Sequence, residues 1–351
     1  MSATLVVGGR EVPPGSCETV EVQLPLLYTH TPVVMSAHVI RGRRDGPCLF
    51  VSAAVHGDEI NGVEIIRRLI RSARLAHLRG SLIAVPVVNV YGFVRRSRYL
   101  PDRRDLNRFF PGSDRGSLTS RLANAFVQEV MSKADFGIDL HTGAVHRENL
   151  PQVRASFDQG GWVERMARAF GSPVILNAEL RDGSLREAGC AMRIPVIVYE
   201  GGEALRFDEL AIRAGVSGIT SVMRELGMLR GTSRASKRKH PSPVVARSTQ
   251  WVRAPQSGIL RAVKPLGARV AKDDILGWIA DPLGAGEVPV EAPVAGIVIG
   301  RIKLPLVNEG EALYHIARFA ETDTAAEAVE RFQEILGPDA DGPELADPPI
   351  S

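Results

Sequence analysis

The chain has 351 residues, more than one ordinary domain needs, so we expect two domains. Its 44% hydrophobic and 24% charged residues are typical of a soluble globular protein, and the formal charge of +3 favours neither a nucleic-acid nor a membrane partner. No apolar run approaches the ~20 residues that span a bilayer. The three cysteines are widely spaced and predict reduced thiols. Without a recognisable signal peptide, the expected location is the cytoplasm.

The first part of the chain alternates predicted strands with a helix. Val20–Leu27 and Pro32–Ile40 have the apolar pattern of strands. A near-continuous apolar strand at Cys48–Val55 is followed by an amphipathic helix at Glu59–Ala73 and a second buried strand at Ser81–Val88. This β-α-β order predicts an α/β layered domain.

A long loop, Asn89–Gly112, interrupts this pattern and contains six arginines. Ordered loops of this length are usually functional, although a solvated basic loop is the alternative. Residues 142–195 are mixed in character. The further elements predicted after the loop are helices at Ser117–Ala134, Gly161–Phe170 and Glu209–Leu226, and strands at Asp135–His141 and Ile194–Tyr199.

The C-terminal part follows a basic stretch, Arg230–His240, that we interpret as a linker. Ala254–Leu260 is repeated as Ala292–Val298, which predicts two similar β halves packed on one core. This region resembles the barrel-sandwich hybrid of biotinyl and lipoyl carriers, but the stretch that matches the carrier hairpin, Asp281–Glu291, contains no lysine. The predicted organisation is an α/β domain over 1–240, a β domain over 241–320, and a tail over 321–351 that begins as a helix at Ala325–Leu336 and ends as an acidic, mobile segment.

Candidate metal ligands follow the first buried strand, in the segment H-G-D-E. His56 and Glu59 are three residues apart at the start of a predicted helix, so the imidazole and the carboxylate can converge on one ion. Two such ligands and a third from elsewhere would leave a coordination position open, as in catalytic zinc sites. An HxxE pattern also occurs by chance, so the other strand ends must support it.

Two later strands end in residues that complete such a site. His141 follows the strand that begins at Asp135, and Glu200 follows Ile194–Tyr199. Residues after several strands meet at one edge of an α/β sheet. Asp139 shares a strand face with His141 and could orient its ring, although a structural role is as plausible. Glu200 is the preferred general base, with Glu203 as the competing candidate.

These motifs resemble the succinylglutamate desuccinylase/aspartoacylase family, a branch of the zinc-carboxypeptidase-like fold. The resemblance rests on H-G-D-E, R-Y at Arg98-Tyr99, D-L-N-R at Asp105–Arg108, D-L-H-T at Asp139–Thr142 and the strand-end Glu200. It implies an α/β fold, a zinc-carboxypeptidase-like three-layer domain with a mixed central sheet, and a C-terminal all-β domain like the barrel-sandwich hybrid.

The resemblance also implies one zinc ion per chain and a role for each matching residue. The implied zinc ligands are His56, Glu59 and His141, and the implied general base is Glu200. Arg98 would polarise the substrate carbonyl, with Asn107 and Arg108 gripping a substrate carboxylate. The spacer after Arg98-Tyr99 is longer than in aspartoacylase, so Arg104 could take the role of Arg98. Tyr314 is a further candidate for substrate contact, through a faint similarity to a C-terminal segment of aspartoacylase.

The sequence therefore predicts a zinc-dependent amidohydrolase that cleaves a small N-acyl amino acid or related N-acyl amine. A zinc carboxypeptidase acting on peptides is the alternative on the same scaffold, and a non-catalytic adaptor using the β module is an alternative of a different class. No nucleic-acid or membrane partner is expected. The sequence leaves homo-oligomers possible and does not identify the acyl group.

Overall fold

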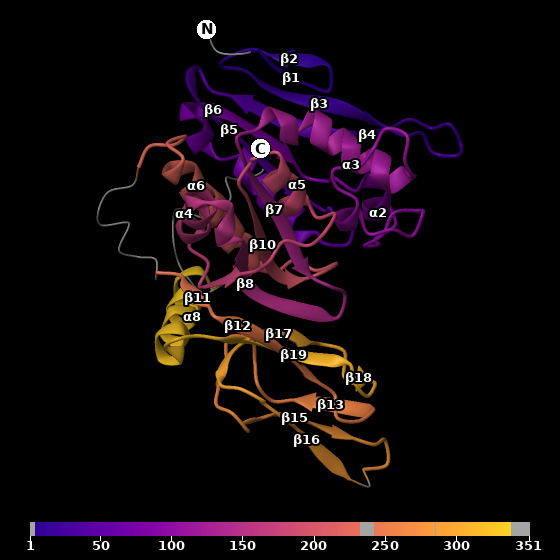
Figure 1. The fold of residues 1–351 in the computed structure, drawn as a ribbon, viewed down its shortest axis with the longest axis vertical. Coiled ribbons are helices and arrows are strands. Elements are labelled where there is room, and N and C mark those ends of the chain that lie inside the picture. The colour runs from indigo at the N-terminus through magenta and orange to yellow at the C-terminus, as the bar shows by residue number, and fades with distance from the viewer. Residues whose placement is uncertain (1–3, 232–241, 285, 338–351) are drawn as a thin grey trace.

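The computed structural model describes residues 4–231, 242–284 and 286–337 (Figure 1). Most of the predicted linker Arg230–His240, and the acidic end of the tail, lie outside the described residues. Within the described ranges, every helix is too short or too polar to cross a membrane.

The first ten strands belong to the part of the chain that carries the predicted metal ligands. They are β1 (Leu5–Val7), β2 (Arg10–Val12), β3 (Cys17–Leu24), β4 (Val33–Arg41), β5 (Arg44–Ala53), β6 (Arg79–Val85), β7 (Phe136–Gly143), β8 (Arg147–Ala155), β9 (Val174–Asn177) and β10 (Val196–Glu203).

The helices cover this sheet. They are α1 (Asn61–Ile70), α2 (Val90–Val94), α3 (Leu118–Glu129), α4 (Gly161–Phe170), α5 (Leu185–Ala191), α6 (Glu209–Glu225) and α8 (Thr322–Leu336), with short 3-10 turns η1 (Ala73–His77), η2 (Leu106–Arg108), η3 (Met131–Lys133) and η4 (Phe157–Gln159). Polar side chains cap several helices: Ser117, Ser184 and Asp208 each accept a backbone N–H in the first turn of α3, α5 and α6.

The large sheet has 13 strands and is mixed, as predicted for the central sheet. Strands β6, β5, β7 and β10 are adjacent and parallel, while β3 and β4 join antiparallel, and β8 pairs antiparallel with β10 and parallel with β9. β7 and β10 are buried along nearly their whole length, and β5 is buried from Cys48 onward, because helices cover both faces. Apolar residues of α1, α4, α6 and α8 pack on one face, and those of α3 and α5 on the other. The predicted α/β fold with a large mixed sheet is therefore confirmed, and helices cover both faces of that sheet.

The C-terminal part consists of strands followed by α8. The strands are β11 (Val244–Ala246), β12 (Ser248–Arg253), β13 (Gly258–Ala262), β14 (Arg269–Val270), β15 (Ile275–Ala280), β16 (Glu287–Glu291), β17 (Gly296–Ile302), β18 (Leu306–Val307) and β19 (Ala312–Arg318). β12, β19 and β17 continue the large sheet through β8, and β16, β15, β13 and β18 form a separate four-stranded sheet. Figure 1 shows this sheet at the opposite end of the molecule from β1 and β2.

Most predicted elements are confirmed with boundaries shifted by a few residues. The predicted helix Glu59–Ala73 begins two residues later, at Asn61, and the predicted strand Val20–Leu27 is β3, Cys17–Leu24. The region described as mixed, 142–195, contains a long strand that the sequence did not single out. This strand, β8, lies between β10 and β17 and connects the two parts of the chain.

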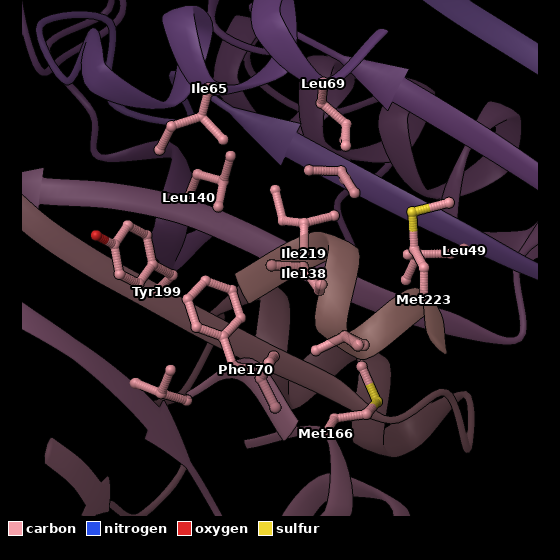
Figure 2. Packing of buried hydrophobic residues seen from close by; sticks show 14 of the residues in the cluster. Leu49, Ile65, Leu69, Ile138, Leu140, Met166, Phe170, Tyr199, Ile219 and Met223 are labelled. Atoms are coloured by element: carbon pink, nitrogen blue, oxygen red, sulfur yellow. The ribbon is translucent and has the colours of Figure 1, made fainter. Parts of the chain in front are cut away.

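The core beside β7 and β10 is built from aliphatic and aromatic side chains of both strands and of the helices above them. Figure 2 shows Ile138 of β7 enclosed by such side chains, and Phe170 of α4 beside Tyr199 of β10. The rings of Phe170 and Tyr199 are stacked, with centroids 4.9 Å apart. The Tyr199 hydroxyl donates to the Ala211 carbonyl at 2.7 Å, so its polar atom is satisfied although the residue is fully buried. This core holds the strands that carry His141 and Glu200.

We expect Ile138→Ala to lower the free energy of unfolding by about 2–5 kcal/mol, because the fully buried side chain would leave a cavity in close-packed surroundings. Ile138→Val removes one methylene and should cost only about 0.5–1.5 kcal/mol. Urea unfolding followed by circular dichroism measures both values. Equal losses for the two variants would contradict the packing described.

Candidate metal centre

The parallel strands β5, β7 and β10 place their carboxyl ends side by side. Ser52 of β5 is the register partner of Asp139 on β7, and His141 of β7 is the register partner of Glu200 on β10. Register partners point to the same face of a sheet, so His141 and Glu200 are neighbours without any contribution from loops. Polar residues distant in sequence are therefore brought to one sheet edge.

His56 reaches this edge because the chain turns sharply after β5. Ala54 adopts a left-handed conformation with φ of 50°, which is strained for a residue with a Cβ. Its carbonyl accepts from the Asn89 amide at 2.9 Å, which fixes the turn. Gly57 passes so close to the backbone of α2 that a Cβ would lie 2.1 Å from the Gly92 carbonyl carbon. The glycine of H-G-D-E is thus required for close packing.

Three buried side chains converge at this turn. The Nδ1 atom of His56 lies 2.7 Å from one Glu59 oxygen, and the Nδ1 atom of His141 lies 2.7 Å from the other. The two Nδ1 atoms are 3.2 Å apart. One ligand atom from each residue falls within 4.8 Å of the others, so the three can hold a metal ion.

A carboxylate lies at the outer nitrogen of each ring. His141 Nε2 is 2.7 Å from Asp139, whose other oxygen accepts from the Ser52 hydroxyl at 2.7 Å. His56 Nε2 is 3.1 Å from Asp105. A carboxylate at each Nε2 can accept from that nitrogen when the ring is neutral, and the Nδ1 lone pair of such a ring would face a bound metal ion. Two imidazole lone pairs and a carboxylate would then face one another. This donor set fits zinc, and a bound cation would relieve the repulsion between these electron-rich atoms.

The charges in the cluster are strongly coupled. Burial lowers the pKa of His141, but the charges of Asp139 and Glu59 and the hydrogen bonds to them outweigh burial and raise the pKa well above its usual range. For the acid Glu59, burial acts in the opposite direction and raises the pKa. The charges of the two histidines and their hydrogen bonds outweigh burial and bring the pKa of Glu59 far below its usual range. The groups that increase the proton affinity of the rings also increase their affinity for a metal ion.

Glu200 lies in the same cavity as the three converging side chains. One of its oxygens is 2.9 Å from Arg154 Nε, and the other accepts from Asn149 at 3.0 Å. Both partners come from β8, the strand that the sequence did not single out. Glu203, the competing candidate, accepts from the His146 amide at 3.0 Å and is not among the cavity-lining residues. The structure thus brings Glu200, and not Glu203, to the cluster.

Arg98 and Arg104, the two alternatives for one role, occupy different places. Arg98 donates to Glu59 at 3.2 Å and to Asp105 at 2.9 Å, and it lines the cavity. Arg104 lies over the Phe109 ring and 3.8 Å from Asp102, outside the cavity lining. The expectation that Arg104 could take the role of Arg98 is therefore corrected. Of the two arginines, Arg98 is at the cluster, and the spacer turns Arg104 outward.

Asn107 and Arg108 also line the cavity. The Asn107 side-chain oxygen accepts from the Leu185 amide at 2.9 Å, which ties the D-L-N-R turn to the first residue of α5. Arg108 is exposed, and one of its guanidinium nitrogens donates to the Asn107 carbonyl. Both side chains are therefore positioned to meet a ligand that enters the cavity.

Tyr314 is not brought to this site. It is fully buried on β19 within the core of the C-terminal strands, and its hydroxyl donates to the Leu276 carbonyl at 2.8 Å. Burial raises its pKa to about 12. The expectation that Tyr314 contacts substrate is corrected, because its polar atom is already used inside the β core.

The cavity around the cluster has a volume of about 740 Å³, within the range of small-ligand sites. Sequence reasoning missed several of its polar residues: Arg154, Asn177, Arg181 and Arg186 line it, and Asp105 joins His56 to Arg98. Burial, together with the charges of nearby arginines, lowers the pKa of Arg186 to about 10. Asp105 could have been found from its place in D-L-N-R, but the others lie in the region of mixed pattern.

Comparison with known proteins gives relatives of similar length. The N-alpha-acetyl-L-2,4-diaminobutyric acid deacetylase of Halomonas elongata is 26% identical over 300 residues, covering 82% of this chain and 87% of that protein. A succinylglutamate desuccinylase/aspartoacylase structure from Rhodobacter sphaeroides superposes with a TM-score of 0.76 at 24% identity, covering 86% of this chain and 96% of that one. The product-bound ectoine utilization protein EutE (DoeB) from Ruegeria pomeroyi superposes with a TM-score of 0.77 at 24% identity, covering 88% and 97%.

The two structural likenesses show that the fold is shared along nearly the whole chain. The family model of the succinylglutamate desuccinylase/aspartoacylase catalytic domain matches residues 45–226, just over half of the sequence. That segment begins with β5 and ends after α6, so it contains every strand that carries a residue of the cluster. The chain belongs to the succinylglutamate desuccinylase/aspartoacylase family.

Proposed function

We propose that this protein is a zinc-dependent deacylase that hydrolyses the amide bond of a small N-acyl amino acid or related N-acyl amine. The observation that carries the proposal is the convergence of His56, Glu59 and His141 beside Glu200 in one cavity. Two imidazole nitrogens and one carboxylate suit zinc and leave a coordination position open for catalysis. One zinc ion per chain, held by these three residues, agrees with this donor set.

The proposed chemistry uses Glu200 as a proton carrier. When bound, zinc lowers the pKa of water at its open position to about 7 and polarises a carbonyl group. Glu200 takes a proton from the attacking water and gives it to the leaving nitrogen, which departs as an amine. Arg154 and Asn149 hold its two oxygens, so the carboxylate is already oriented before the reaction begins.

The arginines of the cavity supply the remaining contacts. In this scheme Arg98, which lines the cavity, donates to the substrate carbonyl oxygen as negative charge develops there. Arg108 and the Asn107 amide grip a substrate carboxylate in the same scheme, since a guanidinium binds a carboxylate through two parallel hydrogen bonds. The name of the deacetylase from Halomonas elongata supports an N-acetyl amino acid as the substrate class.

We propose the domain division given by the sequence, 1–240, 241–320 and 321–351, with a barrel-sandwich-like fold for the middle part. The repeated segments and the two packed sheets of β11–β19 support this division. Ala246, Ser248 and Thr249 line the cavity, and we propose that the C-terminal strands narrow its entrance. A narrow entrance favours small acyl amino acids over the peptides of a carboxypeptidase. The cytoplasmic location and possible homo-oligomers stay predictions.

We expect His141→Ala to lose the bound zinc, because removing one of three protein ligands leaves an incomplete site. Asp139→Asn should weaken zinc binding roughly 10- to 100-fold, since the ring of His141 loses its ionised partner. Zinc per chain after dialysis, measured by plasma mass spectrometry, tests both variants. The exposed His77→Ala serves as the control and should retain zinc. Full zinc content in His141→Ala would rule out the proposed ligand set.

Glu200→Gln should keep zinc but lower turnover by roughly 10²- to 10⁴-fold, the range for loss of a general base. The assay measures amine release from N-acetyl, N-succinyl and N-formyl amino acids, with unblocked peptides as the comparison. Glu203→Gln, outside the cavity lining, should retain turnover within about tenfold, because it transfers no proton in this scheme. A zinc-loaded Glu200→Gln with unchanged turnover contradicts the assigned base, and cleavage of peptides alone favours the carboxypeptidase.

Arg108→Leu should raise KM by about 10- to 100-fold, since a charged hydrogen-bonded contact contributes roughly 1.5–3 kcal/mol. Arg104→Leu is the matched control, because Arg104 lies in the same loop but outside the cavity lining. Its KM should stay near that of the unaltered enzyme. Steady-state kinetics on the best N-acyl amino acid give both values, and equal effects of the two substitutions would remove the proposed role of Arg108.

A further inference from the structure

A second cavity lies at the other end of the parallel strands. Its volume is about 840 Å³, and it is formed where the chain enters β3, where β4 turns into β5, along η1, and after α6. Strand β5 begins at this cavity with Arg44 and ends at Ala53, just before the turn that carries His56. The two cavities thus occupy opposite ends of the same strand, and the proposed deacylase chemistry makes no use of the second.

The charge around this cavity has one sign. Five arginines line it, Arg41, Arg43, Arg44, Arg79 and Arg230, together with His77. Among the described residues, no aspartate or glutamate lines it. The cavity at the metal centre differs, because its five arginines share the lining with Glu59, Asp139, Glu179 and Glu200. The second cavity, which we call the arginine cavity, is therefore a site of concentrated positive charge.

The sheet carries two of these arginines on one face. Arg44 and Arg79 are register partners on the neighbouring parallel strands β5 and β6, so their side chains leave the same face of the sheet. Within the described part of the chain, no carboxylate forms an ion pair with Arg43, Arg44, Arg79 or Arg230. Repulsion between such guanidinium groups is relieved when an anion binds between them.

Hydrogen bonds hold the backbone at two of these arginines, Arg41 and Arg79. The Gly15 amide donates to the Arg41 carbonyl and the Arg41 amide to the Ser16 carbonyl, both at 2.9 Å. The Arg79 amide donates to the Met228 carbonyl at 2.9 Å, which ties β6 to the segment after α6. Gly42 is packed so tightly that a Cβ would lie 2.1 Å from the Leu78 carbonyl oxygen. The wall is thus built in advance of any ligand, which lowers the entropic cost of binding.

We propose that the arginine cavity binds a phosphoryl group, either as free phosphate or as part of a small phosphorylated molecule. Planar guanidinium groups bind phosphate oxygens through paired, charge-assisted hydrogen bonds. A concave site of this volume suits a small ligand. The small net charge of the chain, +3, argues against an extended surface for nucleic acid. Binding here would place a second ligand site at the far end of β5 from the metal centre.

Cys17 provides a local reporter, because its exposed thiol lines the arginine cavity. The experiment measures alkylation of Cys17 by neutral iodoacetamide in the full-length zinc-loaded protein, by peptide mass spectrometry. At about ten times Kd, roughly nine-tenths of the chains carry the anion, so a ligand that shields the thiol should slow alkylation about tenfold. Cys190, which is outside this cavity, is the internal control and should react at an unchanged rate.

The probes are inorganic phosphate, adenosine monophosphate and adenosine, each compared with sodium chloride at equal ionic strength. Saturable protection by phosphate or by the monophosphate, without protection by adenosine, is the expected result. If the monophosphate protects at a lower concentration than inorganic phosphate does, the preferred ligand is an organic phosphate. If the two protect at equal concentrations, the preferred ligand is free phosphate. If chloride at the same ionic strength slows the alkylation of Cys17 equally, the effect is electrostatic screening alone and the proposal is overturned.

Matched variants distinguish binding at the arginine cavity from nonspecific attraction of anions to exposed arginines. Arg44→Gln combined with Arg79→Gln should abolish saturable protection, and its melting temperature in chloride should equal or exceed that of the unaltered protein because repulsion is relieved. Arg318→Gln removes an exposed arginine on β19 that is outside the cavity lining, and it should retain protection. Equal protection in the double variant and in Arg318→Gln would refute the arginine cavity as a phosphate site.

Discussion

The structure depends on one buried carboxylate, that of Glu59, which receives the Nδ1 atoms of two histidines on its two oxygens. A buried charge is tolerated only when it is paired and hydrogen-bonded. The surrounding groups complete this pairing: Asp139 and Asp105 hold the outer nitrogens of the rings, Ser52 holds Asp139, and Arg98 bridges Glu59 and Asp105. The members come from β5, the turn after it, β7 and the loop that carries Arg98 and Asp105, so the cluster unites the sheet edge and the D-L-N-R turn.

The parallel register of β5, β7 and β10 makes this cluster possible. Because Ser52 pairs with Asp139, and His141 with Glu200, a slip of one residue would turn these side chains to the opposite face. Continuous burial on both faces fixes the register, since Leu49, Ile138 and Tyr199 all belong to one core. The hydrophobic packing and the polar site are thus two consequences of the same strand alignment.

Strand β8 connects this site to the C-terminal strands. It lies between β10, whose Glu200 it contacts through Arg154 and Asn149, and β17. Beyond β17, the ring of Trp251 stacks on His315 with centroids 4.0 Å apart, and Arg147 of β8 lies over Trp251. Burial and the charges of Arg154 and Arg147 lower the pKa of His315 to about 3, so this stacked ring is neutral. The strand that supplies both partners of Glu200 is therefore packed against the C-terminal strands.

The sequence by itself determined the local features: the buried strands, the amphipathic helices, the mixed-sheet fold class, and the short motifs holding His56, Glu59, His141 and Glu200. The strands, helices and motifs follow from apolar periodicity and from residues adjacent along the chain, whereas the mixed sheet was implied by the family resemblance. Only the tertiary structure decided between Arg98 and Arg104, placed Tyr314 in the β core, and supplied Arg154 and Asn149 as partners of Glu200. Such choices depend on which strands become neighbours and on where a loop turns. Local pattern does not contain that information, because contacts between distant segments are set by packing of the whole sheet.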